Sequence, residues 1–511
     1  VLWITPMRAL ANDTAHAIEK FAHELGLPWS IELRTSDTTQ TMRKKQRDRL
    51  PTVLITTPES VSMLMSYPGA DERLRSIRCV VVDEWHELLS TKRGTQAELA
   101  LARLRNLSPE LRVWGLSATL GNLDEAARVL LPNDANPLVI HSSIEKVLSV
   151  ETLIPTTIEH FPWAGHMGLR MVEPVAKIVE GGGTTLIFVN TRAQSEIWFR
   201  QLLEARPDWI GKLAIHHGSL DRKLRLQVEA LLREGSLIGA VCTSSLDLGV
   251  DFPAVDQVIQ ISSPKGIGRL LQRAGRSGHR PGEISRIYCA PTHAFELIEF
   301  SAAREGIALR EVEPRAPLIK PLDVLVQHLV TIASGSGFRP DEMLMEVRSS
   351  YAYKTITDDE WRWCLDFIRR GGETLRAYER FTKVRPDDEG VWRIVDDRLA
   401  RLHRLGIGTI TSEGVVQLVM GSGKKLGTIE ESFISKVNPG QVFVFAGRAL
   451  EMVGMRQMTA RVRPAKKRAT SIPQWGGGKF PLSTQLAHKV RQRLDQARVG
   501  IFGDEEMRAI E

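Results

Sequence analysis

Cysteine is scarce in this sequence of 511 residues, and long hydrophobic runs are absent from it. No apolar stretch is long enough to span a bilayer, which argues against a membrane role. Residues 1–6 lack the basic flank and the cleavage site of a signal peptide. The four cysteines are scattered and form no C-x-x-C pair, so the pattern indicates neither a zinc knuckle nor a disulfide framework. A reducing, cytoplasmic compartment fits this usage.

The phosphate-cradling pattern Gly-x-x-x-x-Gly-Lys-Ser/Thr is also missing. Residues 421–425 and 476–480 contain glycine and lysine, but they have neither the spacing nor the hydroxyl that the pattern requires. The sequence does not begin with methionine, and residues 1–6 have the composition of a buried strand that is entered in mid-fold. We therefore expect the chain to be a fragment of a longer protein.

The composition is that of ordinary globular domains, with 42% hydrophobic and 25% charged residues. The length predicts roughly three or four domains. A net charge of +7 is compatible with a mildly basic enzyme or with a track for a phosphate backbone. Basic residues cluster at residues 43–49, 269–280 and 461–468, although each cluster alone is more often a solvated face.

Two successive parts of the chain alternate short β-branched runs with amphipathic stretches, which is the βαβ rhythm of a parallel sheet. The first part predicts strands at residues 1–5, 53–56, 79–82 and 112–115, and helices at residues 7–25, 59–65 and 94–107. The second part predicts strands at residues 186–189, 213–216, 238–242, 257–261 and 284–289.

From about residue 312 the pattern changes to that of a winged helix. Helices are predicted at residues 321–333, 341–347 and 361–370, followed by a strand pair at residues 392–394 and 407–411. Beyond about residue 415 the chain is rich in β-formers, glycine and basic residues. We predict an α/β protein with parallel-sheet domains at residues 1–138 and 139–310, a winged helix at 311–414, and a β-rich module at 415–511 that is truncated at its end.

Two adjacent acids, Asp83 and Glu84, follow three valines that predict a buried central strand. The carboxyl ends of such strands are where open α/β sheets place their ligands. In nucleotide hydrolysis Asp83 would hold Mg²⁺ through its water shell, and Glu84 would polarise the attacking water. A strand that ends in two exposed acids is an equally good interpretation of this pair alone.

Small hydroxyl residues follow two other predicted strands. Ser117 and Thr119 come after the strand at residues 112–115, where their hydroxyls could bond a neighbouring loop and report the nucleotide state. A helix cap is the better interpretation when these residues are taken alone. After the strand at residues 238–242, the hydroxyls of Thr243 and Ser244 could hold a phosphate at a helix start.

Residues 272–278 combine Gln272, Arg273 and Arg276 with nearby glycines. Phosphoryl transfer needs a cation at the γ-phosphate, and Arg276 suits this role with Arg273 assisting. The dense Arg/Gly pattern favours function over a basic helix that merely faces solvent. Upstream of it, Gly249 and Asp251 would turn the chain back toward the nucleotide, although a capped helix also explains them.

Further hydroxyl, amide and basic residues stand at predicted strand-to-helix turns, where they can hold phosphates without reading bases. Ordinary helix capping is the alternative for each of them. The candidates for nucleic-acid binding are Thr5, Arg8 and Thr57 in the first part, and Asn190, Arg192, His217, Thr243 and Ser244 in the second part.

Each of these motifs alone is weak evidence for a function, but their order along the chain is specific. Asp-Glu-x-His at residues 83–86, Ser-Ala-Thr at 117–119, Thr-Ser-x-Leu-Asp-x-Gly-Val-Asp at 243–251 and Gln-x-x-Gly-Arg-x-Gly at 272–278 resemble the motifs of superfamily 2 helicases. Residues 83–89, 92–94 and 473–483 carry a closer resemblance to the Lhr helicases, and within them to the bacterial ligase-associated DEXH-box branch.

The resemblance covers nearly the whole chain. It implies two RecA-like domains, a winged helix and a β-barrel-like module around a single strand, with ATP and Mg²⁺ as cofactors. It implies that ATP sits between the two RecA-like domains, with Asp83 and Glu84 on one side and Arg276 and Arg273 on the other. His86 completes the catalytic set that it implies, and the cofactor-binding set is Ser117, Thr119, Gly249, Asp251 and Gln272.

The resemblance also implies a cellular setting. It predicts 3′-to-5′ movement on single-stranded DNA or a tailed duplex, in DNA repair beside a ligase and a nuclease, in the cytoplasm at the nucleoid. Trp475 would be a platform on which bases stack, with an interface tryptophan as the alternative. The missing phosphate loop should precede residue 1, so we expect the fragment to hydrolyse ATP poorly or not at all.

Two other functions stay open at this point. Phosphate-gripping motifs barely distinguish sugars unless a 2′-hydroxyl is read, so a remodeller of RNA or of RNA–DNA hybrids is a close alternative. The missing phosphate loop also admits a nucleic-acid clamp that does not hydrolyse ATP.

Overall fold

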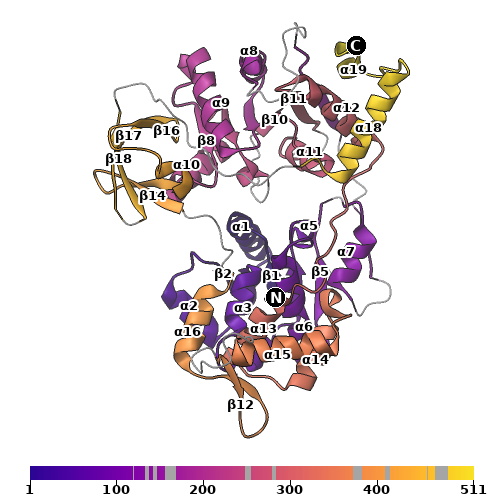
Figure 1. The fold of residues 1–511 in the computed structure, drawn as a ribbon, viewed down its shortest axis with the longest axis vertical. Coiled ribbons are helices and arrows are strands. Elements are labelled where there is room, and N and C mark those ends of the chain that lie inside the picture. The colour runs from indigo at the N-terminus through magenta and orange to yellow at the C-terminus, as the bar shows by residue number, and fades with distance from the viewer. Residues whose placement is uncertain are drawn as a thin grey trace. The chain divides into compact units, whose positions relative to one another are not determined.

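A computed structural model describes the chain except for residues 119, 133–136, 142–146, 156–167, 248–254, 279–282, 372–381, 409–414, 457 and 466–480. The chain divides into two compact units, and each unit combines two separate stretches of sequence. Unit 1 comprises Val1–His141 and Pro314–Ile410, and unit 2 comprises Ser142–Glu313 and Thr411–Glu511. Figure 1 labels their elements.

Unit 1 is built on a parallel five-stranded sheet with the order β2-β3-β1-β4-β5. Its central strands are buried on both faces, since Val82 on one face and Ile55 on the other have no exposed surface. Near-continuous valine and isoleucine runs are typical of such strands. The strands are β1 (Leu2–Ile4), β2 (Ile31–Arg34), β3 (Val53–Thr56), β4 (Cys79–Val82) and β5 (Arg112–Gly115).

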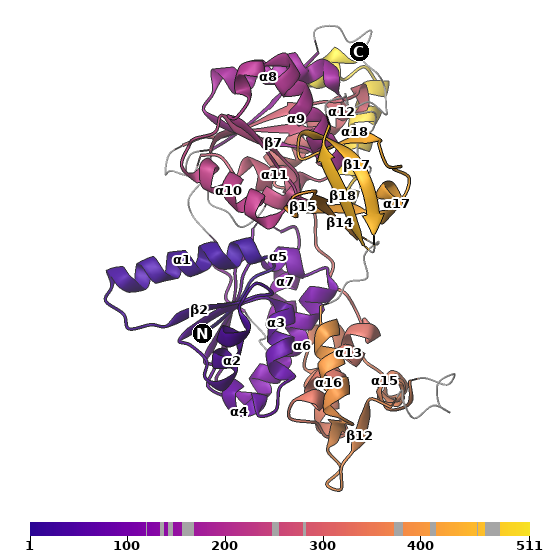
Figure 2. The same cartoon turned by 90° about the vertical axis from the view of Figure 1, so that its left-hand side faces the viewer.

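Helices of unit 1 connect these strands, as Figure 2 shows. They are α1 (Arg8–Glu24), α2 (Gln40–Asp48), α3 (Pro58–Met65), α4 (Ala70–Leu74), α5 (Trp85–Leu88), α6 (Lys92–Leu107) and α7 (Leu123–Leu130). The parallel register places the residues that follow β1, β3, β4 and β5 at one edge of the sheet. This carboxyl edge is where ligands bind in open parallel sheets.

The winged helix packs against this sheet domain within unit 1. Its α13 contacts α3 and α6 (Figure 2), and one hydrophobic cluster contains both Leu329 of α13 and Leu101 of α6. At the same junction Arg103 forms ion pairs of 3.0 Å with Glu346 and 2.5 Å with Asp71. The elements are α13 (Leu322–Ser334), α14 (Pro340–Arg348), α15 (Asp358–Arg370), β12 (Val384–Pro386), β13 (Trp392–Ile394) and α16 (Asp397–Gly406).

The strand pair of the winged helix differs from the predicted one in the described part of the chain. There β13 pairs with β12, a strand that was not predicted, in an antiparallel pair that joins Val384 to Ile394. The chain between β13 and residue 407 forms α16, which the Asp396 side chain caps by accepting from the Leu399 N–H. Of the predicted second strand, residues 409–411 lie outside the described part of the chain.

Unit 2 contains a parallel six-stranded sheet with the order β6-β11-β10-β7-β9-β8. The strands are β6 (Leu148–Thr152), β7 (Thr184–Phe188), β8 (Leu213–His216), β9 (Gly239–Cys242), β10 (Val255–Ile261) and β11 (Ser285–Ala290). The helices that accompany them are α8 (Val172–Gly181), α9 (Arg192–Ala205), α10 (Arg222–Arg233), α11 (Ile267–Ala274) and α12 (Ala294–Ala308).

The β-rich module of unit 2 is a five-stranded sheet with the order β15-β14-β18-β17-β16. Strands β14 and β18 run parallel, and the other neighbours are antiparallel. Its elements are β14 (Val415–Met420), β15 (Lys425–Glu430), α17 (Glu431–Ile434), β16 (Val442–Phe445), β17 (Arg448–Arg456) and β18 (Thr459–Pro464).

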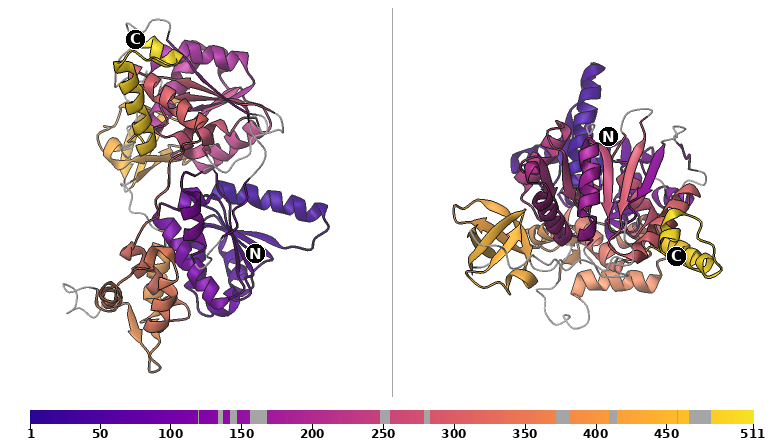
Figure 3. Two further views of the ribbon diagram at one scale, coloured as in Figure 1. Left: turned by 90° about the vertical axis from the view of Figure 1, so that its right-hand side faces the viewer. Right: turned by 90° about the horizontal axis from the view of Figure 1, so that it is seen from above.

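The end of the chain returns to the parallel sheet domain of unit 2 as two helices, α18 (Thr484–Arg498) and α19 (Glu505–Ala509). Both contact α12, and Figure 3 shows α18 in yellow beside it. The buried Glu506 carboxylate accepts from the Thr152 hydroxyl at 2.6 Å and pairs with Arg304. The β-rich character that the sequence predicts for residues 415–511 therefore ends, among the described residues, with β18.

Candidate functional site

Asp83 and Glu84 lie at the carboxyl edge of the unit 1 sheet, directly after β4. The Asp83 carboxylate accepts from Trp3 Nε1 at 3.1 Å and from the Glu84 backbone N–H at 2.9 Å. Burial raises the pKa of Asp83, and these two hydrogen bonds oppose that rise. Glu84 has a positive φ of 47°, which is uncommon for a residue other than glycine and is typical of functional sites.

This geometry fits a carboxylate that holds Mg²⁺ through water. Each Asp83 oxygen accepts one of these hydrogen bonds, and a carboxylate offers about four lone pairs, so acceptor capacity remains. Among the described residues there is no group of three His, Cys, Asp or Glu side chains that could hold a metal ion. Mg²⁺ commonly takes one or two carboxylates and completes its shell with phosphates and water.

His86 connects the acidic pair to residues 117 and 118. Its Nδ1 accepts from the Ala118 backbone N–H at 3.1 Å and lies 3.3 Å from the Ser117 hydroxyl. Nε2 therefore carries the proton, and it lies 3.4 Å from a Glu84 oxygen. Burial lowers the pKa of His86, and the nearby Arg315 lowers it further against the opposing charge of Glu87. The neutral ring thus positions Glu84 instead of carrying charge itself.

A second network at this edge involves a residue of the segment that leads into the winged helix. The Asn122 side chain donates to the Arg315 carbonyl at 3.1 Å and accepts from the Arg315 N–H at 2.8 Å. The Arg315 guanidinium lies 3.7 Å from the Glu87 carboxylate. Sequence reasoning missed Asn122, Arg315 and Trp3, because no local pattern marks partners that are 193 or 80 residues apart.

The predicted phosphate-gripping residues of unit 1 gather at the same edge of the sheet. The buried Thr5 hydroxyl donates to the Met7 carbonyl at 3.1 Å, and the Thr57 hydroxyl donates to Ser60 at 3.3 Å. Arg8 reaches Asp37 at 3.0 Å with a side chain that is 48% exposed. Thr5 and Thr57 are thus buried, and Arg8 presents a charged group at the surface.

The corresponding residues of unit 2 are held by local hydrogen bonds. Asn190 donates to the Ser263 carbonyl at 2.7 Å, and Arg192 donates to the Ser219 hydroxyl at 2.8 Å. Thr243 is buried, and the exposed Ser244 begins a short 3₁₀ helix (Ser244–Leu246). Arg192 and Ser244 are therefore better placed than Thr243 to meet a ligand directly.

His217 has no exposed surface, in contrast to the surface position that a direct ligand contact requires. Its Nε2 lies 3.1 Å from the Glu196 carboxylate, and Nδ1 accepts from the Ser219 N–H at 3.3 Å. The Phe445 ring packs against its edge with centroids 6.2 Å apart. In this arrangement the His217 side chain shapes the loop that contains Ser219.

Arg273 and Arg276 have different surroundings within unit 2. Arg273 is 1% exposed, and its guanidinium donates to both Asp247 oxygens at 2.8 and 3.2 Å and to Gln260 at 2.6 Å. The Phe188 ring lies 4.8 Å from it. Arg276 follows three residues later, just beyond the end of α11, and is half-buried, as is Gln272. The buried bonds of Arg273 fix residues 243–247 against α11.

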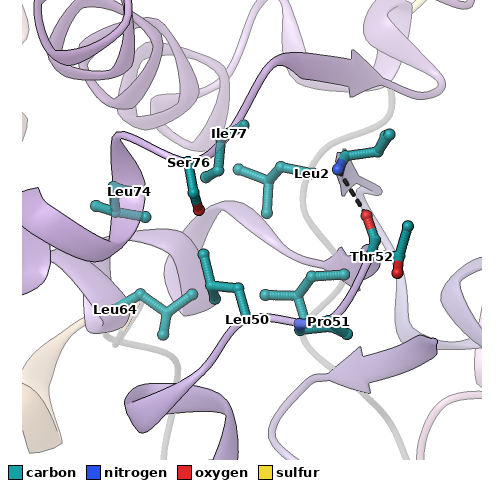
Figure 4. A pocket seen from close by; sticks show the side chains of 10 residues that line it. Leu2, Leu50, Pro51, Thr52, Leu64, Leu74, Ser76 and Ile77 are labelled. Atoms are coloured by element: carbon teal, nitrogen blue, oxygen red, sulfur yellow. Dashed lines mark hydrogen bonds between the residues drawn. The ribbon is translucent and has the colours of Figure 1, made fainter. Parts of the chain in front are cut away.

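Four of the predicted site residues lie outside the part of the chain that the structure describes: Thr119, Gly249, Asp251 and Trp475. Most of the late motif at residues 473–483 lies outside it as well. A described segment near the first strand forms a cavity of about 150 Å³ (Figure 4). Aliphatic side chains such as Leu2, Leu50 and Leu74 line it without a charged side chain, so it is not a phosphate site.

None of the helices in the described parts of the chain combines the length and the apolar character needed to cross a membrane. Three family models match successive parts of the sequence. The DEAD/DEAH box helicase model matches residues 1–126, and the helicase conserved C-terminal domain model matches residues 171–281. The winged helix domain model of the large helicase-related protein matches residues 305–472.

Curated relatives match almost the whole chain. The ATP-dependent helicase Lhr-Core protein 2 of Thermococcus barophilus is 32% identical over 510 residues, which cover 96% of this chain and 59% of the relative. The ATP-dependent helicase Lhr-Core of Methanocaldococcus jannaschii is 31% identical, over 95% of this chain and 58% of the relative. The chain thus spans about three fifths of the length of these relatives.

Solved structures agree with the fold. The Mycobacterium smegmatis helicase Lhr, bound to single-stranded DNA and AMP-PNP, has a TM-score of 0.70 and 30% identity, covering 81% of this chain and 55% of that one. The helicase MrfA bound to DNA has a TM-score of 0.70 at 19% identity, covering 91% of this chain and 61% of that one. The second likeness bears on the fold alone.

Proposed function

Because the chain belongs to the Lhr family of superfamily 2 helicases, we propose that the intact protein uses ATP hydrolysis to move along nucleic acid and separate its strands. One observation carries the proposal. At the carboxyl edge of the unit 1 sheet, Asp83 is held by Trp3, and the neutral His86 ring joins Glu84 to Ala118. A carboxylate oriented by a neutral imidazole can accept a proton from an attacking water.

In this proposal the two units supply different groups to one ATP. Asp83 would hold Mg²⁺ through water, and that ion would supply neutralisation of the developing phosphate charge. Glu84 would orient and deprotonate the attacking water, and Ser117 and Thr119 are further cofactor-binding candidates of unit 1. Arg276 would stabilise the charge of the transferred phosphoryl group. The remaining cofactor-binding candidates of unit 2 are Gln272, Gly249 and Asp251.

For Arg273 we propose a positioning role in place of the role beside the arginine finger that the sequence suggested. Its bonds to Asp247 and Gln260 support a role in holding the segment at residues 243–247, which contains Thr243 and Ser244. Breaking a buried ion pair costs about 3–5 kcal/mol, so the guanidinium is not easily released toward a nucleotide. Arg276 is therefore our candidate for the arginine finger.

We propose single-stranded DNA or a tailed duplex as the track, with movement from 3′ to 5′. The DNA-bound structure of the M. smegmatis relative supports the choice of DNA. Thr5, Arg8, Thr57, Asn190, Arg192 and Ser244 would grip phosphates, and Trp475 would stack on a base. A repair role beside a ligase and a nuclease, and a place at the nucleoid, are proposed from the family resemblance alone.

The sequence of residues 1–511 contains no Gly-x-x-x-x-Gly-Lys-Ser/Thr loop. We propose that this chain alone hydrolyses ATP poorly and that the intact protein supplies such a loop. Stimulated hydrolysis by residues 1–511 at the rate of the intact protein would refute this. If the intact protein has no such loop, the non-hydrolysing clamp becomes the better account.

Glu84→Gln in the intact protein tests the proposed chemistry. It removes the base but keeps the size of the side chain, so strand-stimulated ATP turnover should fall by about a hundredfold or more. Binding of a fluorescent ATP analogue should stay at the level of the unaltered protein. Glu24→Gln, an exposed substitution at the end of α1, is the matched control and should leave turnover unchanged.

The same assay separates the possible tracks. Stimulation by single-stranded DNA well above stimulation by RNA of equal length supports the DNA assignment. Equal stimulation favours a remodeller of RNA or RNA–DNA hybrids, and retained hydrolysis by Glu84→Gln contradicts the role given to this carboxylate.

A further inference from the structure

The β-rich module contacts the loop at residues 217–221 directly, within unit 2. The Thr428 N–H donates to the Ser219 carbonyl at 2.8 Å, and the Asp221 N–H donates to the Leu426 carbonyl at 2.9 Å. These bonds form an antiparallel bridge between Leu220 and Gly427. Strand β15 of the module thus extends onto a loop that belongs to the parallel sheet domain.

Gly427 makes this approach possible. Its φ is +152°, and a Cβ atom placed there would lie 2.1 Å from the Ser219 carbonyl oxygen. A side chain at this position would push β15 away from the loop, since such a contact is far inside van der Waals distance. The loop and the module are therefore fitted to one another at the level of the backbone.

A buried carboxylate fixes the other side of the same loop. Glu196 on α9 has no exposed surface, and its oxygens accept from the Ala446 N–H at 2.6 Å and the Gly447 N–H at 2.8 Å. The His217 ring contributes a third bond, from Nε2 at 3.1 Å. Nε2 must be the protonated nitrogen because Nδ1 accepts from the Ser219 N–H.

Ala446 and Gly447 are the turn between β16 and β17. Both have positive φ, 53° and 69°, as a two-residue type I′ hairpin requires. Two adjacent N–H groups of such a turn point the same way and match the two oxygens of one carboxylate. A Cβ at Gly447 would lie 2.2 Å from the Phe199 ring of α9, so the turn seats directly on the helix.

The loop held in this way contacts one of the candidate gripping groups. Arg192, the first residue of α9, donates to the Ser219 hydroxyl at 2.8 Å, and Glu196 lies one helical turn after it. The position of the Arg192–Ser219 pair therefore depends on α9, on the His217 ring and on β15 together. No local sequence pattern at residues 217–221 contains this information.

We propose that the β-rich module is a structural part of the nucleic-acid grip of unit 2. Glu196 is the positioning residue that joins the module, through the Ala446–Gly447 turn, to the loop, through His217. This rests on the proposed function, in which Arg192 grips a phosphate of the track, and Ser219 holds the Arg192 side chain in place. His217 then acts through the loop and does not contact nucleic acid itself. The module sets the geometry of the phosphate site in addition to any contact of its own.

Glu196→Gln tests the proposal in the intact protein. The amide keeps one oxygen but places an NH₂ group opposite an N–H of the turn, so a charged hydrogen-bond set is lost. The concentration of single-stranded DNA that gives half-maximal ATP turnover should rise about tenfold, with maximal turnover nearly unchanged. Hydrogen exchange of the Ala446 and Gly447 amides should become faster in the same variant.

Two replacements of His217 separate the positioning effect from a folding defect, because His217→Gln keeps a hydrogen-bond donor and His217→Leu does not. The glutamine amide can still donate toward Glu196 and should keep the DNA requirement within about threefold of the unaltered protein, while leucine should raise it as Glu196→Gln does. Glu204→Gln, an exposed substitution on the same helix, is the matched control and should have no effect.

Two outcomes overturn different claims. If the unaltered protein responds to DNA but Glu196→Gln has the same half-maximal DNA concentration, the positioning role is wrong. A loss of maximal turnover without a change in DNA requirement also contradicts it. If the unaltered intact protein shows no stimulation by any strand, the proposed function itself fails.

Discussion

At the scale of single residues, Glu98 is a buried acid at the junction between the sheet domain and the winged helix. One oxygen accepts from the Ala352 N–H at 3.0 Å, and the other has no hydrogen-bond partner among the described residues. Burial raises the pKa of Glu98 to about 8 from an ordinary value of 4.5. The folded protein therefore keeps a proton here that the unfolded chain releases within this pH window.

The free energy of unfolding should accordingly fall as the pH rises from about 5 to about 8. Between the two pKa values the fall is at most about 1.4 kcal/mol for each pH unit. Glu98→Gln, which stays neutral, should flatten this dependence and stabilise the protein at the upper end. Urea unfolding at several pH values measures it, with the exposed Glu110→Gln as control. An unchanged pH slope in Glu98→Gln would show that this group does not titrate as described.

Arg315 offers a second prediction at this scale. It lies 3.7 Å from Glu87, and its own backbone is held by Asn122. Arg315→Ala should slow strand-stimulated ATP turnover about threefold, because partly exposed ion pairs contribute only ~0.2–1 kcal/mol. Arg315→Lys should restore most of the rate. The exposed Arg128→Ala is the control, and a slowing as large in that variant would point to a general charge effect.

The position of Asp83 and Glu84 at the end of a buried strand was predictable, and the hydrogen-bond partners of the candidate site residues were not. Asp83 and Glu84 follow a valine-rich strand that the sequence predicts, and both lie at the carboxyl edge of the sheet. Which of two neighbouring arginines is buried depends on Asp247 and Gln260, which only the fold brings to Arg273. The enclosure of His217 likewise depends on Glu196 and on a turn about 230 residues later in the chain.

At the scale of elements, the strands with unbroken apolar runs were the predictable ones. Strands β4, β7 and β9 are fully or largely buried, and each contains at least three consecutive apolar residues, which is typical of a buried strand. Short elements without such runs escaped prediction, among them α5 with four residues and β12 with three. Their conformation is set by tertiary contacts, such as the pairing of β12 with β13.

The N-terminus of helix α11 is capped by a side chain from a distant part of the chain. The Ile267 and Gly268 N–H groups at its start donate to Glu313 at 2.5 and 2.7 Å, and Ser483 donates to the same carboxylate at 2.7 Å. An acid at a helix N-terminus satisfies open N–H groups and complements the helix dipole. The sequence could not show this cap, since Glu313 lies 46 residues beyond Ile267.

At the scale of the whole molecule, each compact unit joins one parallel sheet domain to a later module of the chain. Unit 1 adds the winged helix through a shared hydrophobic cluster, and unit 2 adds the β-rich module through Glu196 and β15. The order of domains was predictable from the motifs and the changing rhythm of the sequence. The pairing of distant segments into units was not, because it depends on contacts between surfaces and not on local pattern.

The central proposal is that Glu84 of unit 1 and Arg276 of unit 2 act in hydrolysis of the same ATP. A double-mutant cycle tests it most directly, with single-turnover hydrolysis measured for Glu84→Gln, Arg276→Ala and the combined variant of the intact protein on saturating single-stranded DNA. Arg276→Ala alone should lose about a thousandfold in rate. Because groups that serve one transition state are not additive, the double variant should be no slower than the slower single one. Turnover by Arg276→Ala at the unaltered rate, or losses that multiply in the double variant, would contradict the account.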